Sequence, residues 1–226
     1  MNINRQIDEL RKPATQALSL FALFMILFTG LTFFFGLKYE MLPFYLKAVT
    51  VMELIVIVIS LLQYFRIFNF KDKNQINEKT LKRYAKFLTI INVIGTYNAV
   101  IAFSNLFYFM AIQNHIDLYQ YWLFSMLNML ICFAMGSIGS ILMNLRLPKI
   151  ESIVNVKQKT FIGFLLVFLS QLIYIGEIAE YMMVPNIADS KFLVLGAIGL
   201  IIPAKFIAFQ WIIKYADFKI VVLDEK

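Results

Sequence analysis

Six long apolar blocks dominate this sequence and restrict it to very few folds. They cover residues 15–36, 43–65, 87–112, 119–145, 160–182 and 192–214. Each block is about 22–27 residues long, enough for a helix to cross a hydrocarbon core of about 30 Å with some tilt. Backbone groups in lipid must pair within their own segment, so blocks of this length must be helices. The sequence therefore predicts an all-α integral membrane protein, a bundle of six transmembrane helices forming one domain over residues 1–226.

The composition excludes an ordinary soluble domain. Hydrophobic residues make up 61% of the 226 residues and charged residues 15%, whereas soluble domains average about 45–50% and about 25%. A soluble domain of this size lacks the interior to bury so much apolar surface. The single cysteine, Cys132, excludes an intramolecular disulfide and a Cys-rich metal site, and the single histidine, His115, excludes a His-rich centre. We expect no bound metal and no cofactor.

The basic residues predict how the chain is oriented in the membrane. Of the 21 Lys and Arg residues, 17 lie at the two ends of the chain, in the segment 66–86, or between the fourth and fifth blocks. Only Lys38, Lys47 and Lys191 fall on the other side, and Lys205 lies inside the last block. The positive-inside rule then predicts cytoplasmic N and C termini and a basic cytoplasmic loop at 66–86. We expect a multi-pass protein of the cell membrane, with a bacterial inner membrane favoured by composition.

Smaller patterns predict local packing. Residues 77–86 read as a cytoplasmic extension of the third helix, and the N-terminal stretch as either a short helix on the inner membrane surface or a disordered tail. Small residues four apart, Gly95 with Ala99 and Gly136 with Ser140, predict that the third and fourth helices pack together. Trp122 and Trp211, near block ends, are typical of interface anchors.

Two charged residues lie inside the apolar blocks. Glu53 lies in the middle of the second block, and Lys205 lies in the sixth block beside Pro203. A charge at this depth costs roughly 2.5–3.5 kcal/mol on insertion scales, so such residues usually face the bundle interior or a water-filled cavity. We interpret Glu53 and Lys205 as a central substrate or ion site and Pro203 as a hinge. The alternatives are an ion pair that only locks the second and sixth helices together, and a lysine that extends to the headgroups.

Further polar residues extend this hypothesis. The amides of Asn98, Asn105 and Gln171 are predicted to line a path through the bundle. The alternative is that they only form hydrogen bonds that hold neighbouring helices together. Glu177 and Glu180, three residues apart, are predicted to form an outer acidic vestibule with His115. The alternative for that group is a hydrated acidic rim.

Enzyme motifs are missing. The sequence has no Gly-x-Ser-x-Gly elbow, His-Glu-x-x-His motif, phosphate-binding Gly-rich loop or dinucleotide fingerprint. We expect a non-enzymatic protein, with an intramembrane enzyme acting on lipid as the remaining alternative.

The favoured function is a small transporter or channel for a small solute or ion. The alternative is a non-transporting membrane subunit that docks a partner protein or anionic lipid through its basic loops. The expected partners are the lipid bilayer, the solute or ion, and a second copy or a partner membrane subunit, with no nucleic acid.

Overall fold

The fold is all-helical over residues 3–11, 14–64 and 78–224, which are the residues that the computed structural model describes. The all-α class predicted from the sequence is therefore confirmed. The elements are α1 (Ile3–Leu10), α2 (Ala14–Gly30), the 3-10 turns η1 (Leu31–Phe33) and η2 (Tyr39–Met41), α3 (Phe44–Tyr64), α4 (Glu78–Gln113), α5 (Tyr119–Asn144), α6 (Pro148–Glu151), α7 (Val156–Leu169), α8 (Leu172–Met183) and α9 (Phe192–Asp224).

Five helical segments of the described chain are long and apolar enough to cross a membrane. They are Phe44–Leu62, Lys79–Gln113, Tyr119–Asn144, Val156–Met183 and Phe192–Val221, and a shorter apolar helix covers Ala17–Phe33. Their length and composition indicate a multi-pass membrane location. The start of α4 shows that the predicted extension of the third helix is helical from Glu78 onwards, whereas residues 65–77 of the basic loop lie outside the described residues.

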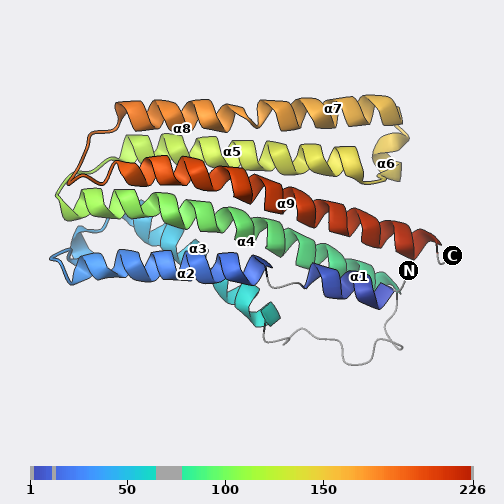
Figure 1. The fold of residues 1–226 in the computed structure, drawn as a ribbon, viewed down its shortest axis with the longest axis horizontal. Helices are drawn as coiled ribbons and strands as arrows, with labels where there is room; N and C mark the ends of the chain where they lie inside the picture. Colours follow the sequence, from blue (N-terminus) through green and yellow to red (C-terminus); the bar gives the residue numbers. More distant parts are fainter. Residues whose placement is uncertain (1–2, 12–13, 65–77, 225–226) are drawn as a thin grey trace.

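Most of the helices form a bundle of nearly parallel rods with α4 and α9 at its centre, and α3 crosses the others obliquely (Figure 1). α2 and α3 pack on one side of α4, whereas α5, α7 and α8 lie on the other side of the bundle. The connections 31–43, 114–118 and 184–191 lie together at one end, which we name the turn end. α1 and the C-terminal part of α9 lie at the opposite end, named the terminal end.

α1 is docked against the bundle. Ile7 and Leu10 are buried in a cluster with Leu88 of α4 and Trp211 of α9, and the Asn92 side chain donates a 2.8 Å hydrogen bond to the Leu10 carbonyl oxygen. α1 is thus a short helix, in line with the first of the two alternatives considered above, and it is held by protein contacts. Trp211 lies in this core with 2% of its surface exposed, so it is not an interface anchor.

The fifth apolar block is not one helix, as the sequence suggested, but two. α7 and α8 are separated at Ser170 and Gln171. In an uninterrupted helix the Ser170 carbonyl would accept from the Tyr174 N–H. Here that N–H donates to the Gln171 carbonyl at 3.1 Å, and the Lys205 ammonium donates to the Ser170 carbonyl at 3.0 Å. The ammonium group of Lys205 on α9 thus takes the place of the Tyr174 N–H as a donor to the Ser170 carbonyl.

The prediction that the third and fourth helices pack through their small residues is wrong about the partner. A Cβ added at Gly139 of α5 would lie 2.6 Å from the Gly163 carbonyl of α7, so these two backbones are in close contact. Ala99 of α4 instead packs with Ala22 and Ile57 of α2 and α3. The small faces of α4 and α5 therefore point in different directions, which spacing alone does not reveal.

A buried lysine fixes the start of α7. Lys159 is 4% exposed and donates to the Leu145 carbonyl at 2.8 Å and to the Glu151 carboxylate. This bond to Lys159 and a second one from the Leu147 N–H lower the pKa of the Glu151 carboxyl group below its usual value. Lys159 was counted among the cytoplasmic basic residues, and the structure shows that it also connects α7 to the α5–α6 linker.

Candidate functional site

Three glutamate side chains lie inside the bundle. Glu53 of α3 is 2% exposed, Glu177 of α8 is 0% exposed and Glu180 of α8 is 1% exposed. Removing a carboxyl group from water is costly unless it is hydrogen-bonded or protonated, so the partners of these groups decide what they can do. In a membrane protein such residues mark ion or proton pathways more often than they serve packing.

Glu53 accepts a hydrogen bond from an amide, and an indole in turn bonds to that amide. The Asn105 side chain of α4 donates to Glu53 Oε1 at 2.7 Å, and Trp122 Nε1 of α5 donates to Asn105 Oδ1 at 2.9 Å. Asn98, two turns before Asn105 on α4, donates to the Glu53 backbone carbonyl at 3.4 Å. Glu53 lies nine residues into α3, which is about 14 Å from the start of that helix at 1.5 Å per residue. The sequence-predicted residues Glu53, Asn98 and Asn105 are thus brought together.

Glu177 and Glu180 form a second group between α4, α5 and α8. Ser125 Oγ donates to Glu177 Oε2 at 3.1 Å, and Asn128 Nδ2 donates to Glu177 Oε1 at 2.8 Å. The Tyr108 hydroxyl of α4 donates to Glu180 Oε1. Every donor in these bonds is an uncharged group, so none of these bonds neutralises a carboxylate.

One oxygen of this group has no donor. Glu180 Oε2 is buried and accepts no hydrogen bond within the described part of the chain. The Glu177 and Glu180 carboxyl groups are close enough for their charges to interact. Two carboxyl groups can share a hydrogen bond only when one of them carries a proton. A proton on either glutamate would remove the repulsion between the two charges.

The two groups lie on consecutive turns of α4 and α5. On α4, Asn105 and Tyr108 are three residues apart and share a face, as do Trp122 and Ser125 on α5. Hydrogen bonds join α3 to α4 and α5 in the first group and α8 to α4 and α5 in the second. Among the described residues no hydrogen bond joins the two groups, which are neighbours and not one continuous chain. We name this set the carboxyl network; its members are Glu53, Asn105, Tyr108, Trp122, Ser125, Asn128, Glu177 and Glu180.

A cavity reaches the network from the turn end. Its volume is about 290 Å³, and Glu53, Asn105 and Phe109 line it together with Thr50 and residues of α2 and η2. Lys47 also lines this cavity. The cavity gives Glu53 a route towards the turn end although the side chain itself is almost fully covered.

Lys205 lies in a separate polar cluster. Its ammonium group donates to the Ser170 carbonyl, to Ser170 Oγ and to Gln171 Oε1, each at 3.0 Å, and it lies 5.5 Å from the centre of the Tyr174 ring. These bonds place Lys205 and Gln171 at the α7–α8 break, whereas Glu53 bonds to Asn105. Pro203 is exposed, and α9 is helical on both sides of it.

The expected outer vestibule is not an open one. Glu177 and Glu180 are buried among three helices, whereas His115 is exposed in the α4–α5 turn, where its φ of 60° is left-handed. A short turn leaves His115 at the surface, and the acidic pair faces inward because α8 presents residues three apart to α4 and α5.

Several members of the network were not identified as site residues from the sequence. Tyr108 carried no polar signal inside its apolar block, and Trp122 was interpreted as an interface anchor. Ser125 and Asn128 were indistinguishable from the other polar residues of the blocks. Their spacing could have identified these residues, because polar side chains recur at intervals of three in Asn105–Tyr108 and in Trp122–Ser125–Asn128.

Comparisons with known proteins place the chain in a family without adding a chemical role. No curated protein and no solved structure matches it. The model of one family, described as "Domain of unknown function (DUF5079)", matches residues 4–226, and the chain belongs to this family over almost its whole length.

Proposed function

We propose that the protein is a multi-pass membrane transport protein that passes protons through its carboxyl network as part of moving a small solute or ion. The observation that carries this proposal is the buried pair Glu177–Glu180, in which Glu180 Oε2 lacks a donor among the described residues. Two adjacent carboxylates repel each other in a medium of low polarity, and a shared proton removes that repulsion. The pair is therefore built to take up and release a proton.

The other residues of the carboxyl network support the passage of protons and not only their storage on the glutamate pair. Tyr108 and Ser125 have hydroxyl groups that both donate and accept, so each can hand on a proton by rotating. Glu53 bonds to Asn105, which lies one turn before Tyr108 on α4, and borders the cavity of about 290 Å³ that extends towards the turn end. Under this proposal the cavity is the entrance, Glu53 is the first proton acceptor and the pair on α8 is the second.

The proposed placement in the membrane is six crossings with both termini in the cytoplasm of, most simply, a bacterial cell. α2 with η1 supplies the sixth crossing, and α7 with α8 forms one crossing despite the break. α1 and the end of α9 share the terminal end (Figure 1), as an even number of crossings requires. The distribution of basic residues supports placing this end in the cytoplasm.

The test is proton movement in proteoliposomes. A pH step is imposed across the membrane, and the internal pH and the transient current are recorded. We expect Glu177→Gln and Glu180→Gln each to lower the protein-dependent signal at least tenfold. The exposed Glu40 offers a matched control, and Glu40→Gln should behave like the wild type. Monodisperse variants that retain wild-type proton movement would overturn the proposal, and a non-transporting subunit would show no signal above empty liposomes.

A further inference from the structure

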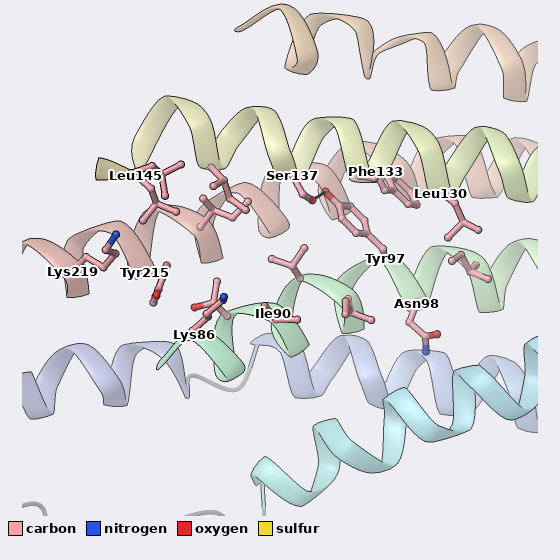
Figure 2. A pocket seen from close by; sticks show the side chains of 18 residues that line it. Lys86, Ile90, Tyr97, Asn98, Leu130, Phe133, Ser137, Leu145, Tyr215 and Lys219 are labelled. Atoms are coloured by element: carbon pink, nitrogen blue, oxygen red, sulfur yellow. Dashed lines mark hydrogen bonds between the residues drawn. The ribbon is translucent and has the colours of Figure 1, made fainter. Parts of the chain in front are cut away.

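A second, larger cavity lies outside the carboxyl network. It has a volume of about 710 Å³ and is bordered by α4, α5, α9 and the linker at Leu145–Leu147 (Figure 2). Its wall on α4 runs from Lys86 to Ile101, a length of about 22 Å at 1.5 Å per residue. The cavity is thus an elongated groove parallel to the helices. Its length exceeds half of a hydrocarbon core of about 30 Å.

The interior of the groove is apolar. Leucine, isoleucine, valine, alanine and aromatic side chains form most of its wall. The few polar groups at mid-length already have partners. Ser137 Oγ bonds to the Tyr97 hydroxyl at 3.4 Å, and the Asn98 side chain bonds to α3. Because Tyr97 also stacks flat on Phe133, with ring centres 4.0 Å apart, the middle of the groove presents ring surface. A polar solute would find little to bind here, whereas a hydrocarbon chain would fit.

One end of the groove is basic. Lys86 of α4 and Lys219 of α9 lie at that end, close to Tyr215 and Leu145, while Asn98 and Leu130 lie at the other (Figure 2). No acidic side chain is among the described residues that line the groove. Lys219 donates to the Arg146 carbonyl at 2.8 Å. That bond fixes the ammonium group at the groove mouth and uses one of its three N–H donors.

One acidic residue close to Lys219 is already paired. Glu151 lies close enough to Lys219 for their charges to interact. It is, however, bonded to Lys159. The side chains that line the groove therefore carry a net positive charge. The mouth of the groove lies at the terminal end of the bundle.

We propose that this groove is a binding site for one anionic phospholipid. An acyl chain lies along α4 and α5, and the phosphate of the headgroup lies between Lys86 and Lys219. Lipid enters from the side, because the groove lies between helices that themselves stand in lipid. Basic pockets between membrane helices are the recognised setting for anionic headgroups, and each lysine near such a headgroup strengthens binding about fivefold. Neither lysine of this site belongs to the carboxyl network.

The experiment measures lipid retained by the full-length protein in mild detergent. The protein is delipidated, titrated with phosphatidylglycerol or phosphatidylcholine of the same chain length, and examined by native mass spectrometry. We expect one phosphatidylglycerol per chain, bound at least tenfold more tightly than phosphatidylcholine. Lys86→Gln with Lys219→Gln should weaken phosphatidylglycerol binding about 30-fold. Binding of phosphatidylcholine should change less than twofold.

Matched controls separate this site from general surface charge. Lys149 and Lys157 are exposed at the same end of the bundle, so Lys149→Gln with Lys157→Gln removes the same charge outside the groove and should leave binding within twofold of the wild type. If the Lys86/Lys219 double variant does not fold, Ala134→Phe narrows the groove without altering charge and should weaken phosphatidylglycerol binding at least fivefold. The proposal is overturned if the two lipids bind equally, if both lysine pairs have equal effects, or if inorganic phosphate displaces the lipid at equal concentration.

Discussion

At the scale of single residues, Lys205 is the side chain whose loss has the most specific expected effect. Its ammonium group replaces a missing helical donor at the Ser170 carbonyl and bonds to two further oxygens. We expect Lys205→Met to lower the free energy of unfolding by about 1–2 kcal/mol, near the low end for charged hydrogen bonds because the group is half-buried. Thermal unfolding in detergent measures this, and hydrogen exchange should accelerate at the amides of Ile173 and Tyr174.

The neighbouring residue supplies the control for this prediction. Phe206 is 62% exposed on the same turn of α9, so Phe206→Met changes only the outer surface of the bundle and should leave both measurements within error. Unchanged exchange at Ile173 and Tyr174 in the lysine variant would contradict the assigned role of Lys205 at the break.

Single residues also show what the sequence could and could not predict about the site. That Glu53 faces inward follows from the cost of exposing a carboxyl group to lipid, and the structure agrees. Its partner does not follow, because Asn105 and Lys205 were both at plausible depth. Rotation of each helix about its axis decides which side chains meet, and that rotation depends on the packing of all neighbouring helices.

At the scale of helices, the contact between α5 and α7 depends on glycine. A Cβ at Gly139 would lie 2.6 Å from the Gly163 carbonyl oxygen and 2.9 Å from the Val167 backbone nitrogen, and neither backbone atom can move without shifting α7. We expect Gly139→Ala to destabilise the protein by about 1–3 kcal/mol, the usual cost of overpacking. Thermal unfolding in detergent measures the change.

A glycine in α9 provides the opposite case. A Cβ at Gly199 meets nothing within 4 Å, so Gly199→Ala should gain the helix propensity of alanine, about 1 kcal/mol. Comparing the two variants separates the effect of close packing from that of helix propensity. The same Gly→Ala substitution should lower the stability of the protein at Gly139 and raise it at Gly199. Equal effects at the two glycines would contradict the close approach of α5 and α7.

The helices themselves were the most predictable level of the structure. Their approximate positions follow from apolar length, and five of the six blocks are long enough as helices to span a membrane. The break at Ser170 and Gln171 was not predictable, since no proline or glycine marks it. It depends on a donor from α9, which is a tertiary contact. For the same reason the partner of the small face on α5 could not be read from its own spacing.

At the scale of the whole molecule, the two proposed sites lie in different parts of the bundle. The carboxyl network lies in the half that contains the turn end, because its residues lie near the ends of α4 and α8 and near the start of α5. The basic mouth of the groove lies at the terminal end (Figures 1 and 2). Asn98 connects them, because it lines the groove and donates to the Glu53 backbone carbonyl. A lipid in the groove would therefore contact the turn of α4 that packs against Glu53.

The arrangement in the membrane gives the last prediction, which concerns the sixth crossing. Cys132→Ser removes the single, buried cysteine and provides a background for new ones. Asp8, Lys38 and Lys149 are exposed positions in α1, in the connection after α2 and in α6. In intact cells an impermeant maleimide should label Lys38→Cys, whereas Asp8→Cys and Lys149→Cys should react only after the membrane is permeabilised. Six crossings put Asp8 and Lys38 on opposite faces; if α2 does not cross, these two positions share a face and react alike. Labelling of Asp8→Cys and Lys149→Cys in intact cells, with Lys38→Cys protected, would instead preserve the six crossings and reverse the orientation that the basic residues predict.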